Sequence, residues 1–347
     1  MYSGVWMYAW DFVDRGVDSV IGRVADARLI GVCPKKDRTR EAGKHLDRCT
    51  ILLCGLLLAA AILPAHAQDA AKAATNAPAP DWTKLTAPYD YDVHKKPTVT
   101  TEERANEKAY VLHIEFKGPD GEKVTGLYGR PKKEGVYPCV LMLHGWTSKK
   151  EDMAAWIGPA IVEQGMSFLA LDAANHGERK APGGKLDFMQ MWRPITIEGI
   201  RDYRMAILWL NDRKDVDRKH FGLLGYSMGA MMGAIFAGLD NRVQAAVLCV
   251  GGDLFRNSES KLPEAMRSES AVISPSLYVG HIAPRPVLLL NGRQDNTVNE
   301  AASKALFAAA KEPKEQMLFD SGHILPTEAL VTGVKWLAKK IKPGAAP

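Results

Sequence analysis

The sequence predicts an α/β fold in which helices cover both faces of a mostly parallel sheet of eight strands. Short apolar runs alternate with stretches of helical periodicity along most of the chain, and such alternation is typical of βαβ units. The first two runs instead follow each other closely, as the strands of a hairpin do. The predicted strands are residues 110–116, 123–129, 138–144, 167–173, 220–224, 244–250, 286–291 and 315–319, and the predicted helices are residues 151–164, 195–211, 227–239, 300–311 and 327–341.

The composition narrows the class of protein. The chain has 347 residues, of which 46% are hydrophobic and 24% are charged, and its net charge is +5 at pH 7. These shares are those of an ordinary globular protein. The positive excess is small and spread along the chain, so we expect neither nucleic acid nor an anionic membrane as a partner. No histidine has metal-ligand spacing to Cys, Asp or Glu, and we predict no metal and no cofactor.

The N-terminal region divides into three parts before the folded domain. Residues 1–48 show no periodicity, and residues 49–67 have the uncharged apolar core and small-residue end of a secretory signal. Because a signal normally begins a chain, we expect translation to start downstream of Met1; an uncleaved signal anchor is the alternative. Residues 68–88 are rich in Ala and Pro and predict a flexible leader. The main domain is then 89–347, secreted or periplasmic and without stable membrane association after cleavage.

The most informative motif is Gly225-Tyr226-Ser227-Met228-Gly229. It joins an apolar strand-like run to a helix of small residues. A Gly-x-Ser-x-Gly at such a strand-to-helix turn is a nucleophile elbow, which raises the serine hydroxyl above the sheet. The motif therefore predicts Ser227 as a nucleophile.

A serine hydroxyl needs a base, and the base needs an orienting acid. Asp295 and His323 each follow a predicted strand, in the chain order that an elbow serine requires. We predict that His323 accepts the Ser227 proton and that Asp295 orients the imidazole. Asp320 and Asp253 are the alternative acids.

Developing negative charge on a substrate oxygen also requires donors. We expect the backbone N–H of Met228, at the start of the helix, and that of Trp146, in the loop after the third strand. Trp146 could also form an aromatic wall. His144, His176 and Trp192 are candidate substrate-binding residues; the alternatives are hydrogen-bonded loop supports for the histidines and ordinary packing of a small lid for Trp192.

These motifs together resemble those of the α/β-hydrolase superfamily, specifically its dienelactone-hydrolase-like and acetyl-xylan-esterase-like branch. The resemblance covers residues 105–341 and rests on Leu143-His144-Gly145, the elbow, Gly292-x-x-Asp295 and Gly322-His323. It implies the α/β-hydrolase fold and serine chemistry. True dienelactone hydrolases use a cysteine nucleophile, so Ser227 argues against that particular activity.

The sequence therefore predicts a serine hydrolase that cleaves small-molecule carboxylic esters through a Ser-His-Asp triad and an acyl-enzyme intermediate. The alternatives are a peptidase or thioesterase with the same triad, or a non-catalytic binding protein of this fold. Acyl and alcohol specificity and the oligomeric state are left open.

Overall fold

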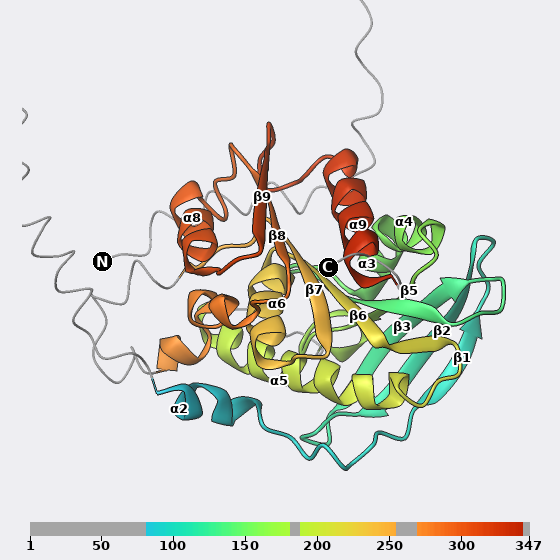
Figure 1. Ribbon diagram of the computed structural model, residues 1–347. Helices are drawn as coiled ribbons and strands as arrows, with labels where there is room; N and C mark the ends of the chain where they lie inside the picture. The colour runs from blue at the N-terminus through green and yellow to red at the C-terminus, as the bar shows by residue number, and fades with distance from the viewer. Residues whose placement is uncertain (1–80, 181–187, 255–268, 343–347) are drawn as a thin grey trace, which may run out of the picture. The chain divides into compact units, whose positions relative to one another are not determined.

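A computed structural model describes residues 81–180, 188–254 and 269–342 (Figure 1). The predicted extension 1–48, the signal-like segment 49–67 and most of the predicted leader lie outside the described residues. So do parts of 176–196 and 252–283, the two long connections in which the sequence predicts a small lid. Among the described residues, no helix combines the length and the apolar character needed to cross a bilayer.

The centre of the fold is one nine-stranded sheet in the order β1-β2-β3-β5-β4-β6-β7-β8-β9. From β5 to β9 all neighbouring strands run parallel, whereas the pairs β1–β2, β2–β3 and β3–β5 are antiparallel. The predicted mostly parallel sheet with an antiparallel start is thus confirmed. The strands are β1 Thr100–Arg104, β2 Ala109–Lys117, β3 Lys123–Pro131, β4 Tyr137–Leu143, β5 Ser167–Leu171, β6 Val216–Tyr226, β7 Val243–Cys249, β8 Val287–Gly292 and β9 Lys314–Phe319.

The predicted count of eight strands was wrong by one. The additional strand, β1, is an edge strand whose five side chains are all exposed. Its sequence, Thr-Thr-Glu-Glu-Arg, has no apolar alternation, because neither of its faces is buried. Strand prediction from hydrophobic period cannot find such a segment.

The helices differ from the prediction mainly at their ends. The stretch predicted as 151–164 forms two helices, and the second begins at Gly158 with Pro159 in its first turn. The second predicted helix, 195–211, begins earlier, at Phe188, and contains Pro194. The helices are α2 Trp82–Thr86, α3 Lys150–Trp156, α4 Gly158–Glu163, α5 Phe188–Leu210, α6 Met228–Leu239, α8 Glu300–Ala309 and α9 Thr327–Ile341, with 3-10 helices at Ala87–Tyr89, Gly177–Arg179, Pro275–Leu277 and Val279–His281.

The end of the predicted leader belongs to the fold. Residues of α2 and of the following 3-10 helix pack on the main domain, with Leu85 and Tyr89 buried. The Tyr89 hydroxyl donates to the backbone oxygen of Val272, 2.8 Å away. The last residues of the predicted leader, from Trp82 on, thus form a short helix that packs on the main domain.

Two hydrophobic clusters lie on opposite faces of the sheet, since alternate residues of the central strands belong to different clusters. In β4, for example, Leu141 belongs to one cluster and Met142 to the other. Helices α5, α6 and α8 supply the first cluster, and α4 and α9 supply most of the helical part of the second. Figure 1 shows α5 and α6 on one side of the sheet and α3, α4 and α9 on the other. Covering both faces leaves the carboxyl ends of the parallel strands as the place for a site.

Candidate active site

The turn between β6 and α6 has the geometry of a nucleophile elbow. Ser227 has φ 53° and ψ −114°, a left-handed conformation that side chains rarely adopt. A Cβ atom on Gly225 would lie 2.2 Å from the Gly229 oxygen, and one on Gly229 would lie 2.1 Å from the Leu143 oxygen. Both flanking positions therefore require glycine, and the turn passes against the end of β4.

The structure brings together the three residues that the sequence predicted as a triad. His323 Nε2 lies 2.8 Å from Ser227 Oγ, and His323 Nδ1 lies 2.8 Å from Asp295 Oδ2. A carboxylate can only accept, so Nδ1 donates its proton to Asp295 and Nε2 accepts from the serine hydroxyl. Ser227 makes no capping hydrogen bond to α6 with its side chain, which leaves the hydroxyl directed to the imidazole.

The acid is fixed by its own loop. Asp295 Oδ1 accepts hydrogen bonds from the backbone N–H groups of Thr297 and Val298, at 2.8 and 2.9 Å. Its side chain is 2% exposed. These two bonds use one carboxylate oxygen and leave Oδ2, on the turn after β8, for His323 Nδ1.

The alternative acids have other partners. Asp253 Oδ2 accepts from the Ser274 hydroxyl and from the Ser276 N–H, and thereby organises the connection after β7. The Asp320 side chain is 84% exposed and pairs with Arg293. The structure therefore places Asp295, and neither alternative, on His323.

The loop after β4 runs beside the elbow. A Cβ atom on Gly145 would lie 3.6 Å from Ser227 Cβ, and Met228 is the first residue of α6. Gly145 and the first residue of α6 are thus both close to the serine. That arrangement is compatible with the predicted oxyanion donors, Trp146 and Met228, whose role stays a prediction.

His144 forms hydrogen bonds to the loop after β4 and to the loop after β5. It is 2% exposed; Nδ1 lies 2.8 Å from the Gly145 oxygen and Nε2 accepts from the Ala173 N–H at 3.0 Å. Burial lowers the pKa of His144 to about 4, so the ring is neutral at pH 7. Both ring nitrogens are engaged with backbone, which favours the loop support over the predicted substrate contact.

His176 and Trp192 are also buried. His176 is 2% exposed and packs edge-on against Trp146, with its Nδ1 2.8 Å from the Ala174 oxygen. Burial lowers its pKa. Trp192 is 0% exposed and belongs to the main hydrophobic cluster. Its burial favours the alternative of ordinary packing, and its predicted contact with substrate stays a prediction.

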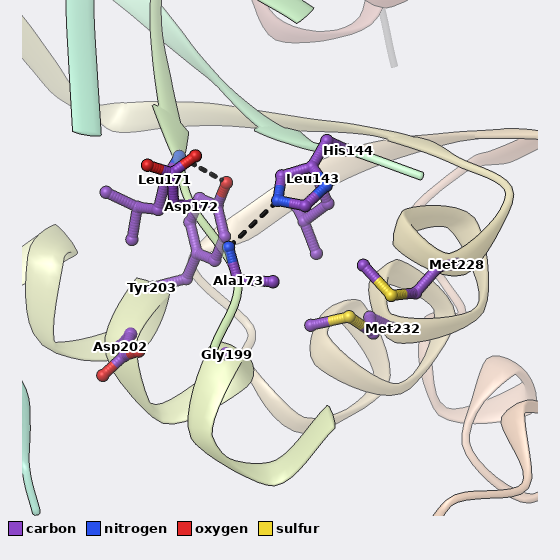
Figure 2. A pocket seen from close by; sticks show the side chains of 10 residues that line it. All are labelled: Leu143, His144, Leu171, Asp172, Ala173, Gly199, Asp202, Tyr203, Met228 and Met232. Carbon is purple, nitrogen blue, oxygen red and sulfur yellow. Dashed lines mark hydrogen bonds between the residues drawn. The ribbon is translucent and has the colours of Figure 1, made fainter. Parts of the chain in front are cut away.

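A small apolar pocket lies behind the elbow, which the sequence did not reveal. Met228 and Met232, one turn apart on α6, point toward Ala173 and Leu143 across it (Figure 2). Asp202 lies on the α5 side of the pocket. Burial raises the pKa of Asp202 to about 6, although the neighbouring positive charge of Arg179 lowers it. The remaining lining residues are His144, Leu171, Asp172, Gly199 and Tyr203.

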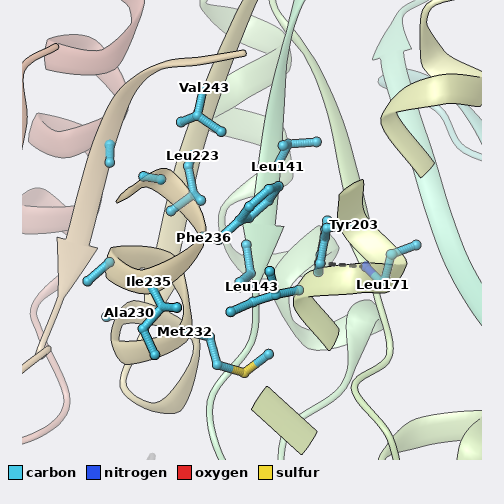
Figure 3. Close-up of a cluster of buried hydrophobic side chains, with 14 of the residues drawn as sticks. Leu141, Leu143, Leu171, Tyr203, Leu223, Ala230, Met232, Ile235, Phe236 and Val243 are labelled. Carbon is cyan, nitrogen blue, oxygen red and sulfur yellow. Dashed lines mark hydrogen bonds between the residues drawn. The ribbon is translucent and has the colours of Figure 1, made fainter. Parts of the chain in front are cut away.

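The helix that carries the elbow is anchored deep in the core. Met232, Ile235 and Phe236 project from α6 into the cluster drawn in Figure 3, among side chains of β4 and β6 such as Leu141 and Leu223. Every residue from Met228 to Ala237 is buried. This packing holds the start of α6, and therefore the elbow, rigidly above the sheet.

A buried ion-pair network fixes the loop after β5. Lys150 Nζ, 0% exposed, lies 2.7 Å from oxygens of Asp172, Glu178 and Glu151. Burial opposes the charge on the ammonium, but these hydrogen bonds outweigh it and leave the pKa of Lys150 raised. Lys150 thereby holds the loop that carries His176 against α3. Lysine is so rarely buried that sequence pattern alone does not indicate this role.

The fold and the elbow define an α/β-hydrolase. The family model of the dienelactone hydrolase family matches residues 124–321, and the chain therefore belongs to that family. Among the described residues, no group of three or more His, Cys, Asp or Glu side chains could hold a metal ion.

Three relatives illustrate the range of similar proteins. A thiohydrolase, AneE, from Aspergillus aculeatus is 25% identical over 189 residues, covering 53% of this chain and 56% of its own length. An esterase, FrsA, from Enterobacter is 27% identical over 172 residues, covering 50% of this chain and 37% of its own. The chain thus spans about half or less of these two relatives. An acetyl xylan esterase structure from Paenibacillus has a TM-score of 0.60 at 19% identity, covering 74% of this chain and 92% of that one; it supports the fold.

Proposed function

We propose that this protein is a serine hydrolase that cleaves carboxylic esters through Ser227, His323 and Asp295. The observation that carries the proposal is the continuous hydrogen-bonded chain from Ser227 Oγ through the imidazole to Asp295, with both links at 2.8 Å. Such a chain lets a neutral imidazole remove the serine proton as the hydroxyl attacks.

In the proposed acylation step, Ser227 Oγ forms a bond to the ester carbonyl carbon while its proton passes to His323 Nε2. The electron pair of the carbonyl moves to oxygen, near the N–H groups of Met228 and Trp146. The tetrahedral intermediate then breaks its bond to the alcohol oxygen, which takes the proton from Nε2. Asp295 stabilises the imidazolium between these two transfers.

Deacylation repeats the sequence with water as the nucleophile. His323 Nε2 accepts a proton from water, whose oxygen attacks the acyl-serine. The proton then returns to Ser227 Oγ as the acid leaves. Each cycle consumes one ester and one water and yields one alcohol and one acid, with no other reactant.

A thioester substrate is the second candidate. The same triad can expel a thiolate, and the similarity to a protein named a thiohydrolase favours testing it. A peptidase or a non-catalytic binding protein has no such supporting observation. Matched oxygen and sulfur esters of the same acyl group separate the first two possibilities.

The decisive experiment combines labelling with turnover. The purified protein should react with a fluorophosphonate at Ser227 and should hydrolyse nitrophenyl esters of short acyl chains. Ser227→Ala should abolish labelling and lower kcat by about 10⁶-fold, on the scale of other serine knock-outs. The matched control is Ser321→Ala, because Ser321 is two residues from His323 but its hydroxyl donates to the Gly322 oxygen, at 3.5 Å, and not to a member of the triad. If the protein is not labelled and turns over no ester or thioester, the proposal is refuted.

We also propose, from the signal-like segment 49–67, that the mature protein is secreted or periplasmic. Edman sequencing of the exported protein should begin at Gln68. Mature protein that retains Met1 would contradict this.

A further inference from the structure

The hydroxyl of Tyr226 contacts the backbone at and just after the catalytic-histidine candidate, His323. It donates to the His323 oxygen at 2.8 Å and accepts from the Leu325 N–H at 3.1 Å. Tyr226 directly precedes Ser227 in the sequence. Two successive residues of the elbow therefore contact the histidine, one through the imidazole ring and the other through the main chain.

The histidine loop needs such an anchor. Residues 320–326 connect β9 to α9 without regular secondary structure. On the Asp295 side the loop is tied by one backbone bond, from the Gln294 N–H to the Ser321 oxygen at 3.0 Å. On the other side, the Tyr226 hydroxyl satisfies the carbonyl of His323 and the N–H of Leu325 at once.

Tyr226 is itself rigid and protonated. Its side chain packs against Trp156, with ring centroids 5.1 Å apart, and the residue is 8% exposed. Burial raises the pKa of Tyr226 to about 12, so the hydroxyl keeps its proton and acts as a donor at neutral pH. A donor on a packed aromatic ring fixes its acceptor more tightly than one on a flexible side chain would.

We propose that Tyr226 is a positioning residue that sets the distance between His323 and Ser227. This inference rests on the proposed function, since it assigns a base role to His323. We call the two hydrogen bonds of the Tyr226 hydroxyl, to His323 and Leu325, the Tyr226 clamp. Because this clamp and the nucleophile belong to the same elbow, any movement of β6 and α6 carries the histidine loop with it. A misplacement of about 1 Å at a reacting group can cost about 10²-fold in rate.

The test is Tyr226→Phe, which removes the hydroxyl and keeps the ring that packs on Trp156. We expect kcat to fall about 10- to 100-fold with KM within about twofold, because only the alignment of base and nucleophile changes. Fluorophosphonate labelling should slow by a similar factor yet reach the same final stoichiometry. Hydrogen exchange at the Leu325 amide should accelerate, since its acceptor is gone.

Tyr137→Phe is the matched control, because it removes a hydroxyl that bonds only to the Lys133 oxygen, away from the site. It should leave kcat and labelling unchanged. A Tyr226→Phe enzyme with wild-type kcat and labelling rate would overturn the clamp while leaving the serine hydrolase proposal intact. A lower melting temperature with unchanged kcat per folded molecule would also overturn it, since that result indicates a structural role alone. Failure of the wild-type protein to label or turn over refutes the proposed function instead.

Discussion

Replacing Asp295 by Asn tests the assignment of the acid most sharply. Oδ1 of residue 295 already accepts from the Thr297 and Val298 N–H groups. An asparagine would keep its oxygen there and turn its NH₂ toward His323 Nδ1. That donor forces the proton of the neutral imidazole onto Nε2, which can then no longer accept from Ser227.

The expected loss is large because the imidazole can no longer act as a base, although the fold is undisturbed. The same change in a serine protease triad lowers kcat by about 10⁴-fold. At about 1.4 kcal/mol per decade, that is about 5 kcal/mol of transition-state stabilisation. We expect a loss of this order in kcat/KM for a nitrophenyl ester, with the melting temperature nearly unchanged.

Asp253→Asn is the matched control. Asp253 is also buried and follows the neighbouring strand β7, but its Oδ2 accepts from Ser274 and Ser276. It should lower the melting temperature and leave kcat/KM of the folded enzyme within about tenfold. If Asp253→Asn instead costs more activity per folded molecule than Asp295→Asn, the assignment of the acid is refuted.

Three further predictions concern the frame of the site. His144 is held neutral with a pKa of about 4, whereas an unfolded histidine has about 6.5, so the unfolded chain binds the extra proton between these values. Stability should therefore fall as the pH decreases from about 6.5 to about 4, by about 3 kcal/mol, and urea titrations of His144→Gln should show a smaller fall; equal pH slopes would contradict this. Lys150→Met leaves Asp172 buried without its cation and should lower the free energy of unfolding by about 3–5 kcal/mol. The exposed pair Lys304–Glu300 provides the control, Lys304→Met, with an expected change below about 1 kcal/mol; similar losses for both would show that burial is irrelevant. Gly229→Ala places a Cβ 2.1 Å from the Leu143 oxygen, so we expect little folded protein and no labelling in the soluble fraction, whereas a folded, active variant would contradict the elbow packing.

The sequence alone determined features that depend on local pattern. Apolar runs that alternate with helical periodicity specified the parallel sheet, because each strand and helix buries its own residues against its neighbours. The two glycines around Ser227 specified the elbow, since they reflect a close approach that only glycine permits. Asp295 and His323 became candidates because each directly follows a predicted strand, in the chain order that an elbow serine requires.

The tertiary structure decided what depends on partners far apart in the chain. His323 lies 96 positions from Ser227 and 28 from Asp295, and only folding shows that it meets Asp295 and not Asp253. Because the side chains of β1 are exposed, the hydrophobic pattern did not indicate this strand. The burial of His144 and Trp192, both predicted to bind substrate, is likewise visible only in the folded chain. The Tyr226 clamp was hidden for the same reason. A hydroxyl carries no periodic signal, and its acceptor and donor partners are fixed only when β6 and the loop before α9 pack together.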